Sequence, residues 1–523
     1  MSSAVLNAKR RAIAKKHKPK GPGPAQIQAP AVHAGKAAPA HAHAARPVAS
    51  HSAASPSPNS GDSNDKGSGR ASFSSSDDYD GDDDGMDEEE DIKDYCKGGY
   101  HKVAIGDEFS GGRYKVLRKL GWGHFSTVWL AYDRTKDIHV ALKIVKSATN
   151  YTEAAQDEIE LCTRAVSVKD QHVGRSYVMQ MLDHFEHSGP NGRHVCMVFE
   201  VLGENLLSLL RGARRDRDRD RDRNHSSDGL PISLVKKIAR QIIAGLAFLH
   251  GPCNMIHTDL KPENVLVCID NVEDVIRGEV RRGTAARDPA GLVLVSRSVA
   301  NSRAPSPARG DAGRPAADVA TGTALSLERD LNDISIAGSP ASPADGGSAA
   351  APARGFLQHV NVKLADLGNA TWADHHFTED IQTRQYRSPE VIIGARWDAT
   401  ADMWSCACVL FELLTGDYLF EPHSGSRYSK DEDHLAQIIE TIGPMPKKFA
   451  LSGRQSSAFF NRRVELRNIR RLRPLPLRDL LRDDYGFSAQ DARETAEFLL
   501  PMLEINPAHR SSAESMLSHR WLR

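Results

Sequence analysis

Hydrophobic positions follow a strand-like pattern in the first ordered part of the chain and a helical pattern further on. Four short runs are rich in β-branched and aromatic side chains, a composition that favours β-strands. These runs are residues 115–120, 127–131, 140–145 and 195–199. Later, apolar residues recur at intervals of four, four, four and three, which predicts one buried helix face: Leu234, Ile238, Ile242, Leu246 and Leu249. A β-rich part followed by an α-rich part predicts an α+β protein of two lobes.

Two stretches interrupt this pattern and are marked by their composition. Residues 212–229 contain a strict alternation of arginine and aspartate, and residues 270–355 are rich in Ala, Arg, Pro, Gly and Ser. The second stretch lies between two strand-like pieces, residues 265–267 and 362–364, so we interpret it as an insert between hairpin strands. Since doubling the length of a loop costs only about 0.6 kcal/mol, such an insert need not unfold the domain.

The N-terminal region differs from the rest of the chain in charge and hydropathy. Residues 21–76 have almost no large apolar side chains, so they cannot bury enough surface to offset chain entropy. The seven Lys and Arg residues before residue 21 are either a nuclear-import or RNA-contacting tail or a solubilising one, whereas residues 77–94 are almost wholly acidic. The expected organisation is a disordered region at 1–93, a first ordered part at 94–270 that contains the charged segment 212–229, a low-complexity spacer at 271–355 and a second ordered part at 356–523.

Charge and cysteine usage exclude several classes of protein. The 68 basic and 68 acidic side chains balance, so no global field favours nucleic acid or membrane as a partner. The seven cysteines include no C-x-x-C pair, which argues against zinc or redox chemistry and for reduced core thiols. There is no signal-peptide pattern and no run of 18 apolar residues, so we expect a protein of the cytoplasm and nucleus without stable membrane association.

The window of residues 257–264, His-Thr-Asp-Leu-Lys-Pro-Glu-Asn, carries the strongest chemical signal. Matched to the kinase catalytic-loop pattern H-R-D-x-x-x-x-N, it assigns Asp259 to accept the proton of a substrate hydroxyl and Asn264 to hold Mg²⁺. Lys261 would neutralise charge on the transferring phosphate. A solvated polar loop is the plain alternative, but D-x-K-P-x-N directly before an apolar strand rarely arises by chance.

Two further motifs that handle phosphates precede this window. Residues 120–128, Leu-Gly-Trp-Gly-His-Phe-Ser-Thr-Val, match the glycine-rich loop G-x-G-x-x-G-x-V, with Ser126 in place of the third glycine. Lys143 in Val-Ala-Leu-Lys matches the lysine that pairs with the α- and β-phosphates. We favour Glu158 as the ion-pair partner of Lys143, with Glu160 as its competitor.

Motifs after the window complete the pattern. Asp366 in Asp-Leu-Gly stands where D-F-G is expected, and the oxygens of Asp366 and Asn264 together suit Mg²⁺, which prefers phosphate and water as its other ligands. Glu390 in Ser-Pro-Glu resembles the glutamate that closes the activation segment, with Arg510 as its basic partner. Asp402 in Asp-Met-Trp resembles the helix start that supports the catalytic loop.

In this order the motifs resemble a eukaryotic protein kinase, and longer strings are similar to the SR-protein kinase family, which phosphorylates Arg-Ser repeats of splicing factors. The strings are residues 95–101, 120–129, 257–259, 366–370, 377–388 and 416–425. The resemblance covers about residues 94–211, 230–270 and 356–523. It implies a bilobal kinase fold with a small β-rich N-lobe and a larger α-helical C-lobe. It also implies ATP and Mg²⁺ as cofactors, Arg-Ser-rich splicing factors as substrates, and a role in mRNA splicing.

The resemblance also assigns roles to particular residues. It implies contacts with ATP at Leu120, Gly121, Gly123, Val128, Lys143, Glu200 and Leu202. It implies an acidic docking groove for Arg-rich substrates at Asp417, Asp433 and Glu440. Because each exposed ion pair contributes at most about 1 kcal/mol and weakens with salt, several acids are needed to hold such a peptide. Asp484 departs from the family, which can carry Lys beside a Tyr near this groove.

Thr258 bears on regulation. Kinases that are controlled by activation-loop phosphorylation usually carry Arg before the catalytic Asp, where it grips the loop phosphate, and this chain has Thr258 there. The resemblance therefore implies a kinase that is active as made, and we expect it to be a monomer.

Other interpretations compete with this one. A dual-specificity kinase of the neighbouring group also acts on splicing factors, but Thr258 and residues 416–425 argue against it. A pseudokinase scaffold is disfavoured because every expected catalytic residue is present, and direct nucleic-acid binding is disfavoured because the basic tail has no aromatic platform. The Arg-Asp alternation is either a weak mimic of a phosphorylated Arg-Ser repeat that competes for the acidic groove or a flexible charged loop without a role.

Overall fold

The computed structural model describes residues 90–169, 171–219, 228–285 and 360–523, and for residues 215–219 and 279–285 it describes the backbone alone. Expectations about the disordered N-terminal region and most of the spacer lie outside these described residues.

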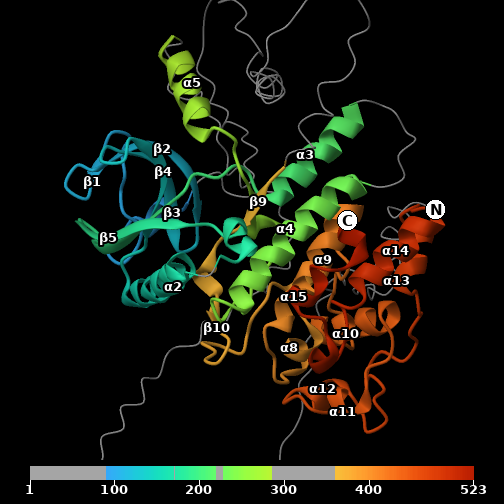
Figure 1. The fold of residues 1–523 in the computed structure, drawn as a ribbon. Helices are drawn as coiled ribbons and strands as arrows, with labels where there is room; N and C mark the ends of the chain where they lie inside the picture. The colour runs from blue at the N-terminus through green and yellow to red at the C-terminus, as the bar shows by residue number, and fades with distance from the viewer. Residues whose placement is uncertain (1–89, 170, 220–227, 286–359) are drawn as a thin grey trace, which may run out of the picture. The chain divides into compact units, whose positions relative to one another are not determined.

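The N-terminal lobe is built on a six-stranded antiparallel sheet with the order β1-β2-β3-β4-β6-β5 (Figure 1). Its strands are β1 (Glu108–Phe109), β2 (Tyr114–Gly123), β3 (Ser126–Asp133), β4 (Ile138–Val145), β5 (Met181–Gly189) and β6 (Gly192–Phe199). The four predicted strands fall within β2, β3, β4 and β6 and are confirmed. Helix α2 (Thr149–Ser167) packs against β4, β5 and β6 and turns Leu161 and Cys162 into the core. The predicted β-rich lobe is therefore present.

Strand β5 was not predicted, and its composition explains why. It lies at the edge of the sheet, and its residues His184, Glu186 and Ser188 are exposed. An edge strand with one solvated face needs few β-branched residues, so its sequence lacks the signal on which the prediction rested.

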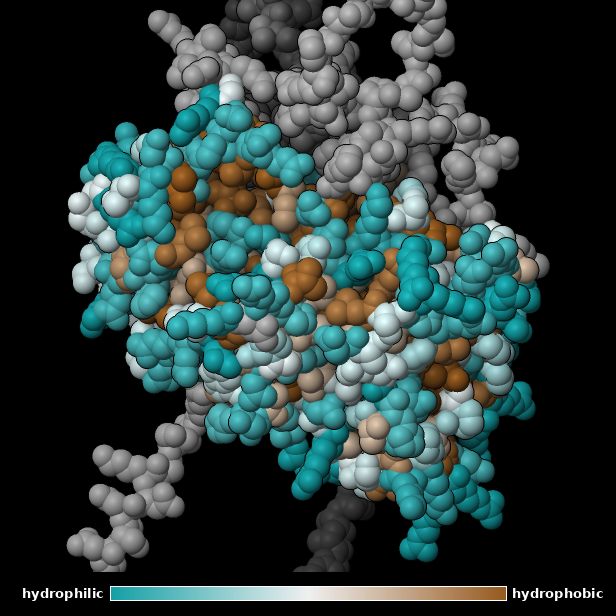
Figure 2. Space-filling model, viewed as in Figure 1, coloured by the Kyte–Doolittle hydropathy of each residue, from teal (hydrophilic) through white to brown (hydrophobic). Residues whose placement is uncertain are grey.

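The C-terminal lobe is helical. Its helices are α3 (Leu206–Arg219), α4 (Ile232–His250), α8 (Pro389–Ile393), α9 (Thr400–Thr415), α10 (Lys430–Thr441), α11 (Lys447–Ala450), α12 (Ser456–Phe459), α13 (Leu477–Asp483), α14 (Ala489–Leu499) and α15 (Ala513–Met516). The predicted apolar stripe lies on α4, and all five of its residues are buried. In Figure 2 hydrophilic residues dominate the lower edge of this lobe, around α11 and α12.

Two short strand pairs hold the segments that carry the chemical motifs. Strand β8 (Val265–Val267) pairs with β9 (Val362–Leu364), and β7 (Met255–Ile256) pairs with β10 (Thr371–Trp372), both antiparallel. The hairpin that the sequence predicted around the insert is thus confirmed as β8–β9. Because β7 precedes the catalytic-loop window and β8 follows it, the window is fixed at both ends.

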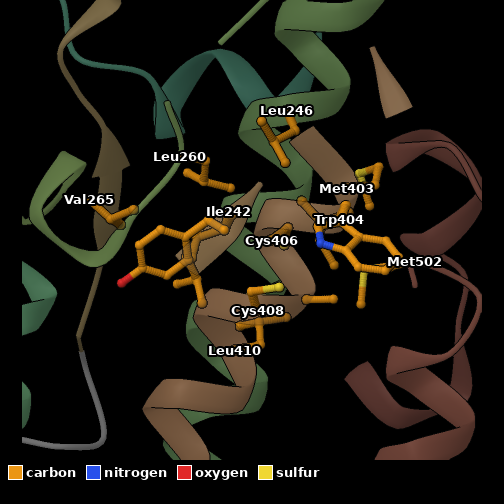
Figure 3. Packing of buried hydrophobic residues seen from close by; sticks show 14 of the residues in the cluster. Ile242, Leu246, Leu260, Val265, Met403, Trp404, Cys406, Cys408, Leu410 and Met502 are labelled. Carbon is orange, nitrogen blue, oxygen red and sulfur yellow. The ribbon is translucent and has the colours of Figure 1, made fainter. Parts of the chain in front are cut away.

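The catalytic loop packs against the core of the helical lobe through Leu260 (Figure 3). Leu260, the residue after Asp259, is only 1% exposed and packs in one cluster with Ile242 and Leu246 of α4 and with Val265 of β8. Burying a leucine side chain contributes about 1.5–3 kcal/mol, so this contact also holds the neighbouring backbone of the loop in place.

The structure differs from the sequence expectation at both interruptions. The charged segment was expected from residue 212, but α3 continues as a helix to Arg219. The spacer was expected to contribute no core from residue 271, but it begins with helix α5 (Val272–Ala285), whose Ile276 is fully buried against Leu130 and Val201. The side chain of Glu273 on α5 accepts a hydrogen bond from the backbone N–H of His139 at 2.6 Å. Composition alone missed this helix because the apolar residues that anchor it are few.

Candidate active site

The backbone of the catalytic loop is held by hydrogen bonds to one buried carboxylate, that of Asp402. The backbone N–H groups of His257 and Thr258 donate to the two oxygens of Asp402, at 2.8 and 2.9 Å, and His250 bonds the same carboxylate at 2.8 Å. Burial alone would raise the pKa of Asp402, but the hydrogen bonds and the His250 and His257 rings outweigh it and lower that pKa. The predicted support of the loop by Asp402 is therefore present, and its carboxylate stays ionised where the loop needs an acceptor.

Asp259 lies at the centre of the site, between a cation and a hydroxyl. The Lys261 ammonium is 2.9 Å from one of its carboxylate oxygens, and the Thr383 hydroxyl donates to the other at 2.7 Å. Burial alone would raise the pKa of Asp259, but Lys261 and Thr383 outweigh burial and hold it below its usual value. An ionised acceptor at this position is what a substrate hydroxyl requires. Thr383 was not predicted to be a site residue, although it lies within the string 377–388.

Asn264 and Asp366 supply the two side-chain oxygens that the sequence assigned to a metal ion. Asn264 ends the short helix η3 (Pro262–Asn264), and its amide donates to the backbone carbonyl of Asp259 at 2.8 Å, which fixes its side chain toward the loop. Asp366 adopts a left-handed backbone conformation with φ of 60°, and its carboxylate lies 3.8 Å from the Lys143 ammonium. One amide oxygen and one carboxylate fit Mg²⁺ better than a softer metal, because Mg²⁺ keeps water and phosphate as its remaining ligands.

The lysine of β4 forms the expected ion pair. The Lys143 ammonium lies 2.7 and 2.9 Å from the two carboxylate oxygens of Glu158 on α2. Glu158 is 5% exposed, whereas the competing Glu160 is exposed, which decides between the two candidates. Burial alone would lower the pKa of Lys143, but Glu158 and Asp366 outweigh it and raise that pKa. The ion pair joins the sheet to α2, and the raised pKa keeps Lys143 a cation at neutral pH.

The glycine-rich motif forms the β2–β3 hairpin rather than a turn that opens a helix. Gly121 faces Val128, and Gly123 faces Ser126 across the hairpin. Val128 in turn lies beside Lys143 on the neighbouring strand. A side chain added at Gly123 would meet no atom within 4 Å, so the backbone there is open to approach. Leu120 belongs to the same hairpin and is half-buried against the cluster of Leu130 and Val201.

The segment after β6 connects the lobes and carries the two remaining predicted ATP contacts. The Glu200 carboxylate is engaged by the Lys363 ammonium of β9 at 2.6 and 2.7 Å, so its side chain has a structural partner. Leu202 is half-buried, and the next residue, Gly203, donates its N–H to the Val267 carbonyl at 2.7 Å. The N–H of Glu200 donates to the Gln180 carbonyl at 3.3 Å, so the carbonyl of Glu200 and the side chain of Leu202 are the groups through which this segment would contact a nucleotide.

The activation segment is held by contacts that do not involve a phosphate. The Thr258 hydroxyl donates to the Asn369 carbonyl at 2.6 Å, in the position where a phosphate-gripping Arg would stand. Gln382 has a positive φ of 70°, and its amide donates to the Ala401 carbonyl and the Ser405 hydroxyl, both at 2.9 Å. The Arg387 guanidinium donates to the Gln382 carbonyl at 2.8 Å. These contacts order the segment without a phosphate.

The end of the segment is locked by a buried ion pair. Glu390 and Arg510 form two contacts of 2.6 and 2.8 Å, and both side chains are 0% exposed. The partnership predicted from the sequence is present. Because removing one member of a buried pair leaves an uncompensated charge, either substitution would cost about 3–5 kcal/mol of stability.

The three predicted docking acids lie on the helical lobe, and each already has a hydrogen-bond partner. Asp433 on α10 accepts from the His423 N–H at 2.9 Å, and Glu440 on the same helix accepts from the Arg473 N–H at 2.7 Å. Asp417 follows α9 and lies 3.5 Å from the Arg214 guanidinium of α3. The side chain of Asp417 is 29% exposed, and Asp433 and Glu440 are half-buried, so the three acids combine a structural contact with access to solvent.

Comparison with known proteins places these observations in a wider context. A protein kinase domain matches residues 114–276 and 356–522. The chain is 45% identical to protein kinase dsk1 of Schizosaccharomyces pombe, over 83% of this chain and 85% of that protein. It is 40% identical to SRSF protein kinase 3 of Homo sapiens, with coverage of 83% and 90%, and 41% identical to the serine/threonine-protein kinase SRPK of Physarum polycephalum, with coverage of 83% and 91%. Within the described ranges, no helix has the length and hydropathy that crossing a membrane requires.

Proposed function

Since this chain belongs to the SR-protein kinase family of protein serine/threonine kinases, we propose that it transfers the γ-phosphoryl group of ATP to serines in Arg-Ser-rich proteins. The observation that carries the proposal is the assembled site: the Asp259 carboxylate, fixed by Lys261 and Thr383, lies 3.4 Å from the Asn264 amide, and the Asp366 carboxylate lies 3.8 Å from the Lys143 ammonium.

In this proposal the residues of the chain divide the work of phosphoryl transfer. Asp259 accepts a hydrogen bond from the substrate serine hydroxyl and takes its proton, which its lowered pKa permits only late in the reaction. Lys261 and Lys143 place positive charge where the phosphate oxygens gain negative charge. Asn264 and Asp366 would hold Mg²⁺, which neutralises and orients the phosphates.

Substrate choice is proposed to rest on the acids of the helical lobe. Asp417, Asp433 and Glu440 offer carboxylates to the guanidinium groups of an Arg-rich peptide, for which a planar bidentate donor is favoured over Lys. Asp433 and Glu440 each accept a hydrogen bond from a backbone N–H group, of His423 and Arg473, and a carboxylate can accept several hydrogen bonds at once.

We further propose that the kinase is active without loop phosphorylation. Thr258 cannot grip a phosphate as Arg does, and Gln382 and Arg387 already order the segment. Regulation would then act through location and partners, with the protein distributed between cytoplasm and nucleus and its activity directed at mRNA splicing.

Phosphate incorporation from labelled ATP into matched peptides tests substrate choice. An Arg-Ser peptide should be phosphorylated at least tenfold more efficiently than a Lys-Ser peptide of equal charge, because only Arg presents a bidentate donor. An Arg-Asp peptide controls for label that does not depend on serine. Equal kcat/KM for the Arg-Ser and Lys-Ser peptides would overturn the substrate assignment. A lack of incorporation into any peptide would instead favour a scaffold without catalysis.

A further inference from the structure

A segment before the kinase domain contacts the glycine-rich hairpin. We call residues 90–101 the N-terminal brace; they precede residue 114, where the match to the kinase domain begins. The brace starts at the Glu90 carboxylate, which is 7% exposed and pairs with the Lys119 ammonium of β2. It ends in the core of the lobe, where Tyr100 is 2% exposed and His101 is 6% exposed. The brace is therefore a packed part of the lobe rather than a tail.

The brace is fixed to the junction between β4 and α2. The carbonyl of Gly99 accepts the Ser147 N–H at 3.1 Å, and the carbonyl of Gly98 accepts the Ala148 N–H at 2.8 Å. The Asn191 amide, from the β5–β6 turn, donates to the Tyr100 carbonyl at 2.7 Å. Since β4 carries Lys143 and α2 carries Glu158, the brace is anchored to the elements that position the catalytic ion pair.

From this anchor the Tyr100 side chain reaches the glycines of the hairpin. The Tyr100 hydroxyl donates to the Gly123 carbonyl at 2.8 Å. Burial, together with the Asp94 and Glu90 carboxylates, raises the pKa of Tyr100 to about 12, so the hydroxyl remains a donor throughout the working pH range. Gly123 is the second glycine of the motif, and its carbonyl belongs to the backbone that must close over the phosphates.

Lys146 links the same parts of the lobe from the other side. Its backbone N–H donates to the Phe125 carbonyl at 2.9 Å, next to the tip of the hairpin. Its ammonium bonds the Asp94 carboxylate at 2.8 Å and lies 4.2 Å above the Tyr100 ring, within the range of a cation–π contact. Tyr100 is thus held by its backbone, its ring and its hydroxyl at once.

We propose that Tyr100 is a positioning residue for the nucleotide, because its hydroxyl fixes the glycine-rich hairpin in the closed position over the phosphates. A hairpin that is already ordered loses less conformational entropy when the nucleotide binds, which tightens binding and slows release. The inference rests on the proposed ATP site but not on the proposed Arg-Ser specificity. It assigns the brace a role in nucleotide affinity that neither the glycine-rich motif nor the catalytic loop supplies.

The test is Tyr100→Phe, which removes only the hydroxyl. Loss of one hydrogen bond that orders the hairpin should raise the Kd for Mg·ADP about threefold to tenfold in isothermal titration calorimetry. The rate of ADP release, measured with a fluorescent ADP analogue, should rise by a similar factor. A Kd within about 1.5-fold of wild type would overturn the inference, since less than about 0.3 kcal/mol would then separate the two proteins.

Tyr114→Phe is the matched control. Tyr114 is equally buried in the same lobe, and its hydroxyl donates to Asp183 at 2.6 Å, far along β2 from the glycines. Both variants lose a hydroxyl and some stability, but only Tyr100→Phe should change the Kd for ADP. Equal increases in both variants would show general loosening of the lobe and would also overturn the inference.

A second variant keeps the inference testable if Tyr100→Phe does not fold. Asp94→Asn keeps the shape of the side chain but removes the charge that holds Lys146 over the Tyr100 ring, and it should raise the Kd for ADP about twofold. An unchanged Kd in this variant would overturn the inference. Because ADP binding is measured without a peptide, failure here can be told apart from failure of the Arg-Ser assignment.

Discussion

At the scale of single residues, the site depends on how Asp259 is kept ionised and aimed. Of the two side chains that contact its carboxylate, Lys261 could be predicted from the sequence and Thr383 could not. Lys261 follows from its spacing to Asp259, whereas Thr383 is 124 residues away and comes close only through the fold of the activation segment. Motif spacing therefore predicted the residues of the catalytic loop, but it could not predict a contact made across the fold.

Asp259→Asn should lower kcat by roughly 10²–10⁴ and leave the Kd for ADP unchanged, because the amide cannot take the proton but fills the same space. Steady-state phosphorylation and calorimetry with ADP measure the two effects. Activity within about twofold of wild type would remove Asp259 from the role of base.

The pH dependence of catalysis follows from the same contacts. Since the pKa of Asp259 is held below its usual value, its carboxylate is ionised throughout the range from pH 5.5 to 8. Protonation of Asp259 should therefore not lower kcat as the pH falls from 8 to 5.5. A fall in kcat with an apparent pKa near 6 that disappears in Asp259→Asn would contradict this expectation.

Glu412 offers a separate test of the electrostatics inside the helical lobe. Burial raises the pKa of Glu412 to about 7, although the Tyr386 hydroxyl donates to it at 2.7 Å and opposes that shift. The folded state thus keeps a proton on Glu412 that the unfolded state releases near pH 4.3. The contribution of Glu412 to the free energy of unfolding is therefore fully present below pH 4.3 and is lost as the pH rises through 7. Glu412→Gln does not titrate. Its free energy of unfolding relative to wild type should therefore be higher at pH 8 than at pH 5 by on the order of 2 kcal/mol, measured by urea denaturation.

At the scale of elements, the strands and the long helix α4 were predictable because their apolar positions repeat with a clear period. Helix α3 shows where periodicity fails: it continues to Arg219 through residues whose composition indicates a loop. Its Arg214 meets Asp417, one of the proposed docking acids, which no local pattern could indicate. Helix α5 was missed for a similar reason, because Ile276 alone is fully buried among residues 272–278, the part of the helix whose side chains the structure describes.

Because α5 is packed against the core, changes within α5 and changes beyond it should have different effects. Deleting residues 286–352 removes no described residue, so peptide kinase activity should stay near that of wild type. Ile276→Ala should instead lower the free energy of unfolding by about 2–5 kcal/mol, because it leaves a cavity between Leu130 and Val201. Activity assays test the deletion, and denaturant unfolding tests Ile276→Ala. Loss of activity in the deletion, or no loss of stability in Ile276→Ala, would show that the boundary between core and spacer lies elsewhere.

At the scale of the whole molecule, the two lobes meet at the catalytic centre. The proposed docking acids, Asp417, Asp433 and Glu440, belong to the helical lobe and are more than 100 residues from the catalytic loop in the sequence. The bilobal kinase fold could be predicted because motifs from both lobes occur in the expected order. The partners of the docking acids could not be predicted, because Asp433 and Glu440 accept hydrogen bonds from the backbone N–H groups of His423 and Arg473, and no side-chain pattern marks such contacts. These contacts determine which substitution is a fair test.

Asp433→Asn and Glu440→Gln together remove the charges but keep oxygen acceptors for the two backbone groups. The double variant should raise KM for long Arg-rich substrates much more than for short ones, because a longer peptide offers more arginines to the docking acids. At 1 M salt the Debye length falls to about 3 Å, so the variant and wild type should converge. The same increase for both substrate lengths would exclude these acids from docking.

The most direct test of the account compares phosphatase-treated protein with untreated protein in the phosphorylation of an Arg-Ser peptide. The site is assembled without a loop phosphate, through Thr258, Gln382 and the Lys143–Glu158 pair. We expect kcat/KM to be the same before and after treatment, to within about twofold, and to fall by roughly 10²–10⁴ in Asp259→Asn. Activity that disappears on dephosphorylation and returns on rephosphorylation would contradict it.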